Sequence, residues 1–419
     1  MIESVLELKE PAIRRGIKTI GIGKKGSKPL DPQLIQEILS DLRTDRVPAV
    51  ARGAFWGALI RKGLTQEEMV LEEAFSPGIF QNPQRLMETL SPEAPDFVKD
   101  ICVQLLEGKT LDQSTAHRLG WFLFSREPGD GARGLAASIL RVRYETPEEY
   151  EGLLRSMEET IEEPFKEDVP GGNPILQLAE PFDGVDHSYL ITPLIADYFQ
   201  RLGYRAVHLV GENSGPKFGN NLLDIARALE ADFLLRNRDL QNQRAAGYGR
   251  YINQNDLSSA VARWVKIRRE IIKRPFLSTL EKFLNPVKAD VLITSAFHPP
   301  YTEKMITIAE RAGFPGMVVI RNGLEGTLSF ALKRAVKIMC STRQKDGSYL
   351  RHEFEFDPEK YLGLTIAMEE KLERPSILEN VRLIEKFMAE GKTGNNLFDL
   401  RVQTTCAGLK LAVDWMKEH

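Results

Sequence analysis

The stretch with the clearest chemistry is a polar loop at residues 180–191. It reads EPFDGVDHSYLI and lies between a short apolar run and a segment with helical spacing. A loop that enters a helix N-terminus presents free backbone N–H groups, and the helix dipole there favours an anion. Asp183, Gly184, His187 and Thr192 are therefore the candidate phosphate-binding residues, and Thr192 is also expected to cap the helix. The alternative is that this strand–loop–helix unit only turns the chain.

A second candidate is a basic segment at residues 236–274. It contains ten lysine or arginine residues and three acidic ones, a net of +7, with Tyr248, Tyr251 and Trp264 between them. Aromatic faces among cations can stack on bases beside phosphates, so single-stranded nucleic acid is the favoured partner. The candidate contacts are Arg236, Arg238, Arg244, Arg250, Arg263 and Lys266. The alternatives are a solvated helix face or pairing of these arginines with the acidic linker at 158–167.

The elements that position the loop follow a repeated order. Apolar runs at 174–179 and 205–210 are each followed by a loop and a helix, at 192–202 and 222–229. Two more strands are expected at 289–295 and 316–320, joined by a helix at 302–312, and later helices at 379–388 and 397–416. This order predicts an α/β fold with a doubly wound, mostly parallel sheet.

The first part of the chain is expected to be all helical and duplicated. KPLD at 28–31 recurs as KTLD at 109–112, ARGA at 51–54 as ARGL at 132–135, and TQEE at 65–68 as TPEE at 146–149. Each pair is 81 residues apart, which favours duplication over chance. The predicted domains are a first helical module at 1–100, a second module with a linker at 101–168, and an α/β domain at 169–419.

Composition limits the function classes. The 419 residues carry a formal net charge of −3, so any basic partner surface must be local. The three cysteines have no metal-binding or disulfide spacing, and no apolar run approaches the roughly 20 residues that span a membrane. We expect a cytoplasmic protein without a membrane partner.

Several of these motifs together resemble anthranilate phosphoribosyltransferase, of glycosyltransferase family 3. The resemblance rests on Asp183-Gly before the helix at Thr192, IRRE at 267–270, and FHP at 297–299. It implies a sheet domain of the nucleoside-phosphorylase and phosphoribosyltransferase class, and a helical domain that forms a homodimer. It also implies binding of phosphoribosyl pyrophosphate, Mg²⁺ and anthranilate, with Arg268 and Arg274 as substrate-binding residues.

The sequence departs from the family at the diphosphate loop. Pro181 and Phe182 replace glycines, Pro181 has no N–H to donate, and Glu180 adds negative charge. The family's metal-binding acidic pair is represented only by Glu325. With GIGKK at 21–25 and RNGLEGT at 321–327, the chain is similar to the divergent second branch of these homologues, which are regarded as nucleic-acid-binding proteins without the transferase activity.

Two functions from different classes follow. The first is a binding protein for nucleic acid or another phosphorylated ligand, without the usual transferase activity. The second is an active phosphoribosyltransferase that acts on anthranilate or another aromatic amine, with Mg²⁺ as its cofactor. We favour the first, because stabilising charge in the transition state requires donors and a metal that the motifs mostly lack.

Overall fold

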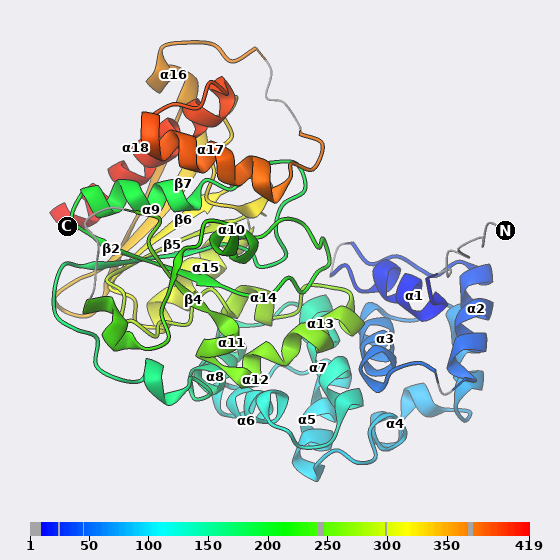
Figure 1. The fold of residues 1–419 in the computed structure, drawn as a ribbon. Coiled ribbons are helices and arrows are strands. Elements are labelled where there is room, and N and C mark those ends of the chain that lie inside the picture. Colours follow the sequence, from blue (N-terminus) through cyan, green and yellow to red (C-terminus); the bar gives the residue numbers. More distant parts are fainter. Residues whose placement is uncertain (1–9, 24–25, 45, 242–246, 298–299, 368–371) are drawn as a thin grey trace. The chain divides into compact units, whose positions relative to one another are not determined.

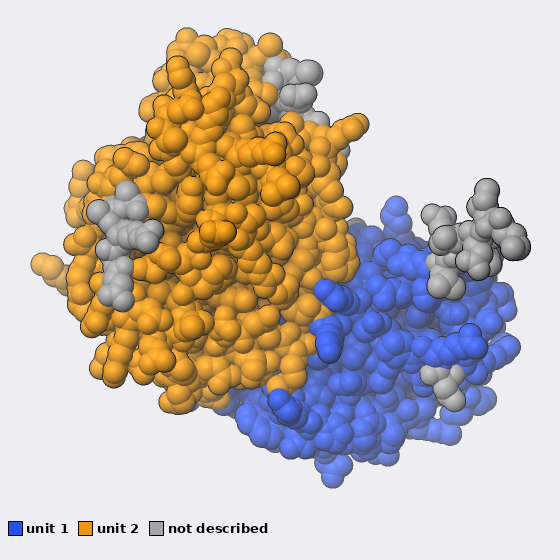
Figure 2. All heavy atoms as spheres, in the orientation of Figure 1, with its two compact units in different colours: residues 1–156, 266–277 blue, residues 157–265, 278–419 orange. Residues whose placement is uncertain are grey.

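The computed structural model describes residues 10–419 except 24–25, 45, 242–246, 298–299 and 368–371. The chain forms two compact units, coloured separately in Figure 2. Unit 1 comprises Met1–Ser156 with Lys266–Leu277, and unit 2 comprises Met157–Val265 with Ser278–His419. The predicted nucleic-acid contact Arg244, and Lys24 and Lys25 of the GIGKK motif, lie outside the described residues.

Helices joined by loops make up the described residues of unit 1. Its helices are α1 (Ala12–Ile20), α2 (Pro32–Leu42), α3 (Ala49–Lys62), α4 (Pro83–Leu90), α5 (Asp96–Leu106), α6 (Gln113–Phe124), α7 (Asp130–Arg143) and most of α8 (Pro147–Glu158), joined by part of α13 (Trp264–Ile271). Two 3₁₀ helices, η1 (Glu68–Ala74) and η2 (Ile79–Gln81), connect α3 to α4. Residue 100, the predicted end of the first module, lies within α5.

Helices α3 and α7 pack against each other at glycines. A Cβ at Gly53 would overlap the carbonyl oxygen of Gly131, and a Cβ at Gly134 would overlap that of Val50. Only glycine permits so close an approach of two backbones. Residues 53 and 134, like residues 50 and 131, are 81 apart, so each contact has a counterpart across the pair of helices.

A buried glutamate also makes matching contacts at the same offset. Glu68 accepts hydrogen bonds from the backbone N–H groups of Leu30, at 2.9 Å, and Thr65, at 2.8 Å. Glu149 accepts from the N–H groups of Leu111, at 2.9 Å, and Thr146, at 2.8 Å. Each Thr–Glu pair is a capping box, since the threonine hydroxyl accepts from the glutamate N–H in return.

Unit 2 is built on one eight-stranded sheet in the order β3-β4-β2-β1-β5-β6-β7-β8. The strands are β1 (Ile175–Ala179), β2 (Arg205–Val210), β3 (Asp232–Phe233), β4 (Arg250–Asn253), β5 (Val291–Ala296), β6 (Gly316–Arg321), β7 (Val336–Arg343) and β8 (Tyr349–Phe356). Six strands are parallel, and β7 and β8 are antiparallel at one edge. The predicted α/β class with a mostly parallel sheet is confirmed.

Helices cover both faces of this sheet (Figure 1). On one face α9 (Thr192–Arg201), α17 (Ile377–Glu390) and α18 (Asn396–Glu418) share a buried core with β1, β5, β6 and β7. On the other face α15 (Pro300–Arg311) lies over β5 and β6. The remaining short helices are α10 (Leu222–Ala228), α11 (Gln254–Leu257), α12 (Ser259–Ala262), α14 (Leu277–Leu280), α16 (Pro358–Leu362), η3 (Glu163–Phe165), η4 (Asn237–Gln241) and η5 (Leu324–Gly326).

The structure can be compared with the expectations about membrane spans and cysteines. Across the described ranges, no helix combines the length and the apolar character that crossing a bilayer requires. Cys102, Cys340 and Cys406 are buried free thiols, and burial raises the pKa of Cys102 and of Cys340 to about 12. These thiols are therefore packing residues with little thiolate character.

Candidate functional site

The candidate site lies where three loops leave the carboxyl ends of parallel strands. The loop at 180–191 follows β1, the loop at 211–221 follows β2, and the loop at 322–328 follows β6. The chain builds the sheet outward from β1 in one direction through β2, and in the other through β5 and β6. Ligands of open α/β sheets bind beside such a reversal of strand order, so the position of these loops fits a binding site.

The loop after β1 is joined to the loop after β2 by backbone pairing. Val185 and Asn220 exchange N–H to carbonyl hydrogen bonds of 2.8 and 2.9 Å. Gly184 has a φ of 74°, and a Cβ there would overlap the carbonyl oxygen of Asn220. Gly184, a predicted phosphate-binding residue, therefore gives room to the protein's own backbone. Asp183 beside it is buried, with 2% of its surface exposed.

Thr192 has a different role from the predicted cap. It is the first residue of α9, and Ile191 occupies the cap position without a side-chain hydrogen bond. The Thr192 hydroxyl instead donates to the buried carboxylate of Glu180, which also accepts from the N–H of Leu328 at 3.0 Å. Burial raises the pKa of Glu180, against the lowering effect of these two hydrogen bonds. The cap assignment was wrong because the helix already includes Thr192, which leaves Ile191 at the cap position.

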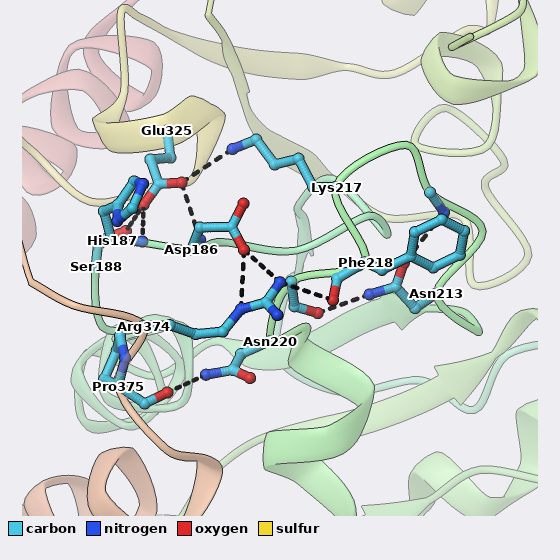
Figure 3. Close-up of polar contacts among 12 residues, drawn as sticks. Asp186, His187, Ser188, Asn213, Lys217, Phe218, Asn220, Glu325, Arg374 and Pro375 are labelled. Carbon is cyan, nitrogen blue, oxygen red and sulfur yellow. Dashed lines mark hydrogen bonds and ion pairs between the residues drawn. The ribbon is translucent and has the colours of Figure 1, made fainter. Parts of the chain in front are cut away.

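Glu325 is the centre of the polar cluster in Figure 3. One carboxylate oxygen, Oε1, accepts from the His187 N–H at 2.6 Å and from the Ser188 hydroxyl at 2.9 Å. The other, Oε2, accepts from the Asp186 N–H at 3.0 Å and from the Lys217 ammonium at 2.9 Å. Burial acts to raise the pKa of Glu325, but the Asp186 N–H, the Lys217 ammonium and the His187 N–H outweigh it and lower the pKa.

Arg374 is a second cation in this cluster and contacts Asp186. The Arg374 guanidinium pairs with the Asp186 carboxylate and donates to the carbonyl oxygen of Phe218 at 3.0 Å. The next residue, Pro375, accepts from the side-chain amide of Asn220 (Figure 3). The His187 ring contacts the carbonyl oxygen of Leu372 through Nδ1 at 2.9 Å. Segment 372–375 thus fastens the loops after β1 and β2.

These contacts do not suit a divalent metal at Glu325. Mg²⁺ requires oxygen ligands with free lone pairs, usually from one or two carboxylates. Here Glu325 and Asp186 already accept from N–H groups, a hydroxyl and two cations. Among the residues that the structure describes, no three His, Cys, Asp or Glu side chains group so as to hold a metal ion. The donor set fits an anion.

Two of the three aromatic residues of the basic segment are buried, so they do not offer a face for base stacking. Tyr251 is fully buried in β4, where it stacks on His208 with ring centroids 4.3 Å apart, and Trp264 is 1% exposed. Arg250 pairs with Asp232 at 3.1 Å, and Arg238 pairs with Glu167 of the acidic linker at 3.2 Å. Tyr251 and Trp264 are therefore core residues, whereas Tyr248 is half-buried and packs against the core of unit 2.

The other predicted cationic residues are distributed over both units. Arg236 is exposed and Arg263 is half-buried in unit 2, whereas the exposed Lys266 belongs to unit 1. The two predicted substrate-binding residues also belong to unit 1, where Arg268 is buried and Arg274 is half-buried. Unit 2 alone therefore brings together Asp183, Gly184, His187, Thr192 and Glu325, and it lacks Arg268 and Arg274.

Sequence reasoning missed Lys217 and Arg374. Lys217 lies in the glycine- and asparagine-rich loop after β2, and Arg374 lies in an RPS sequence just before α17. A lone cation in a turn-rich loop after a predicted strand is a usable signal for an anion site, and Lys217 satisfies it. Arg374 offers no such signal, because its segment follows the antiparallel hairpin.

A cavity of about 480 Å³ lies elsewhere in unit 2, between α9, α17 and α18. Its lining is mostly apolar and includes Tyr198, Phe387 and Met388. Its charged pair is Asp197 and Arg201, which are 2.7 Å apart on α9. The cavity shares no lining residue with the Glu325 cluster among the described residues.

The chain was compared with protein-family models, curated proteins and solved structures. No family model matches the chain. A curated "Uncharacterized protein" of Aquifex aeolicus (strain VF5) is 24% identical over 247 residues, which is 59% of this chain and 68% of that protein.

Two solved structures are similar over most of their length. The anthranilate phosphoribosyltransferase of Thermus thermophilus superimposes with a TM-score of 0.55 at 19% identity, covering 76% of this chain and 98% of that one. The anthranilate phosphoribosyltransferase of Saccharomyces cerevisiae in complex with PRPP and Mg gives a TM-score of 0.60 at 14% identity, covering 78% and 92%. The chain therefore has an anthranilate phosphoribosyltransferase-like fold.

Proposed function

We propose that this protein binds a phosphate-bearing ligand of the phosphoribosyl class at the loops after β1, β2 and β6. We further propose that it does not transfer the phosphoribosyl group to anthranilate. The observation that carries the proposal is the convergence of two backbone N–H groups, the Ser188 hydroxyl and the Lys217 ammonium on one anionic group. Donors of these kinds recognise phosphate in proteins.

The absence of transferase activity is inferred from the start of the same loop. Pro181 lacks an N–H group, and the buried Glu180 places a carboxylate beside the Thr192 hydroxyl. A pyrophosphate there would lose a donor and meet an acidic group. Asp186 and Glu325 are each paired with a cation, so neither offers Mg²⁺ an uncommitted carboxylate.

Binding is tested by calorimetric titration of the full chain with phosphoribosyl pyrophosphate, with and without Mg²⁺. We expect saturable binding that Lys217→Met weakens by about tenfold, since a hydrogen bond from a charged donor contributes roughly 1.5–3 kcal/mol. Lys333→Met is the matched control, because that exposed lysine donates to the carbonyl oxygen of Ala367 instead of to Glu325. No binding by the unaltered protein, or equal binding by both variants, contradicts the proposal.

The alternative is an active phosphoribosyltransferase. It is supported by the fold shared with the yeast enzyme, whose structure contains PRPP and Mg. A steady-state assay with anthranilate, phosphoribosyl pyrophosphate and Mg²⁺ separates the two functions. We expect little or no phosphoribosylanthranilate, and robust turnover would establish the enzyme instead.

Nucleic acid is a second candidate ligand, supported by the local excess of positive charge. Arg236 and Arg238 are exposed next to each other around η4, although Arg238 also pairs with Glu167. If both meet phosphates, replacing both by Ala should lower affinity for a single-stranded oligonucleotide and reduce the salt slope by roughly one unit per contact. The control is Arg382→Ala with Lys386→Ala on the exposed side of α17. Unchanged affinity would remove nucleic acid from consideration at this segment.

A further inference from the structure

The Glu325 cluster has the composition of a phosphate site that is already filled by the protein's own carboxylate. Consecutive N–H groups of Asp186 and His187 donate to different oxygens of Glu325, and Ser188 adds a hydroxyl. Lys217 supplies the positive charge from a separate loop. Three consecutive residues directed at one anion are typical of backbone concavities that bind phosphate.

Glu325 holds this position in an unfavourable backbone conformation. Its φ and ψ are 53° and 17°, in the left-handed region that a residue with a side chain rarely adopts. Glycines stand near it on both sides, Gly323 and Gly326, and Gly326 also has a positive φ of 87°. The four contacts of the carboxylate therefore offset the cost of this backbone conformation.

The side chain also has access to solvent. About 16% of the Glu325 side chain and 26% of the Lys217 side chain are exposed. A displaced carboxylate would regain water, so leaving the site would not strand a buried charge.

We propose that Glu325 is an internal competitor at this site, and that the terminal phosphate of a phosphomonoester or inorganic phosphate displaces it to bind the same four donors. This inference rests on the proposed function and adds the group recognised and the means of control. A phosphomonoester has three terminal oxygens and inorganic phosphate has four, and each carries up to two negative charges near neutral pH, whereas the carboxylate has two oxygens and one charge. The phosphate thus matches the donors better than Glu325 does. Its free energy of binding to the donors must exceed that of the Glu325 carboxylate before it can bind.

The experiment is a titration of the full chain with inorganic phosphate, followed by calorimetry. Glu325→Ala removes the competitor, and we expect its affinity for phosphate to be at least about tenfold higher than that of the unaltered chain. Glu325→Gln keeps the shape but not the charge, and we expect an intermediate gain. Adding Lys217→Met to Glu325→Ala should abolish the gain.

The matched control is Glu353→Ala on β8. Glu353 also pairs with two cations, Lys337 at 3.1 Å and Arg321 at 3.5 Å, so its removal makes the same change in net charge. A gain in phosphate affinity from Glu353→Ala equal to that from Glu325→Ala would overturn the inference, because net charge alone would then explain it.

The outcomes separate this inference from the proposed function. If the unaltered chain binds phosphoribosyl pyrophosphate but Glu325→Ala and Glu325→Gln gain nothing for phosphate, the function stands and the internal competitor is wrong. If the unaltered chain binds no phosphorylated ligand while both variants gain phosphate binding, Glu325 blocks the donors without being displaced, and both the proposed function and the displacement are wrong. Melting curves for each variant verify the fold, and Glu325→Gln provides the test if Glu325→Ala does not fold.

Discussion

Thr192 and Glu180 form a buried polar pair directly after β1. The Thr192 hydroxyl donates to a carboxylate whose surface is 2% exposed. We expect Thr192→Val, which keeps the shape and removes the donor, to lower the free energy of unfolding by about 1–3 kcal/mol, since a buried acceptor loses a partner. Urea denaturation measures this change.

Thr192→Ser is the control for that prediction, because it keeps the hydroxyl and removes one methyl group. The Val variant should be the less stable of the two. If the Val variant proves as stable as the unaltered chain, the hydroxyl contributes no net stability.

The residue types at the site were partly predictable. Asp183, Gly184, His187, Thr192 and Glu325 were identified from a polar loop and from motif comparison, and unit 2 brings these segments together. Their individual contacts were not predictable, because each depends on a residue from a distant loop: Gly184 on Asn220, Thr192 on Glu180, and His187 on Glu325 and Leu372. Sequence spacing indicates that a loop can bind an anion but does not indicate that another loop supplies one.

Among the elements, the pairing of the loops after β1 and β2 depends on Gly184. We expect Gly184→Ala to be destabilising for two reasons, since its φ is 74° and its Cβ would overlap the carbonyl oxygen of Asn220. Gly203→Ala distinguishes the effect of the backbone conformation from that of the overlap. Gly203 also has a positive φ, 88°, but no described atom lies within 4 Å of a Cβ there. Gly203→Ala should cost about 1–2 kcal/mol from its backbone conformation alone, and Gly184→Ala roughly 1–3 kcal/mol more. Equal losses in urea denaturation would show that the loops can separate.

The strands differ in how well the sequence specifies them. The segments β1, β2, β5 and β6 were predicted because buried parallel strands are continuous apolar runs. The segments β7 and β8 were missed, because β8 is largely exposed and rich in charged side chains. The β4 strand was missed because Arg250 and Tyr251 lie in a basic segment, and a local excess of charge is more typical of a surface than of a strand. Tertiary pairing with β2 and β3 decides the conformation there.

At the scale of the whole molecule, stability should depend on pH through His208. Burial lowers the pKa of His208 to about 4, against a smaller raising effect of its hydrogen bond to Tyr248. Because the unfolded state takes up a proton near pH 6.5 and the folded state resists it, the stabilising contribution is complete above pH 6.5 and is lost as the pH falls toward 4. The loss should reach on the order of 3 kcal/mol.

His208→Gln should remove this dependence, which urea denaturation at a series of pH values would measure. The exposed His352 of β8 is the control, and His352→Gln should leave the pH profile nearly unchanged. An unaltered profile for His208→Gln would assign the acid sensitivity to other groups.

Assembly is a further property of the whole molecule. A homodimer stays our prediction, to be checked by measuring the mass in solution at micromolar concentration, where a monomer would contradict it. The surfaces of α3 and α7 that contain Gly53 and Gly134 already pack against each other within one chain. We therefore expect a dimer to pair through other surfaces, and Gly53→Leu to lower stability without selectively abolishing the dimer.

The contact between α3 and α7 has a consequence for how this protein can change over generations. When two identical subunits meet across a symmetry axis, every mutation appears on both sides at once, so a large side chain must tolerate its own copy. Here the two sides are encoded separately. Phe55 and Trp56 of α3 are fully buried aromatic residues, while the positions 81 residues later in α7 are Ala136 and Ala137. One helix carries large side chains where the other carries small ones, a division of volume that paired copies of a single sequence could not make.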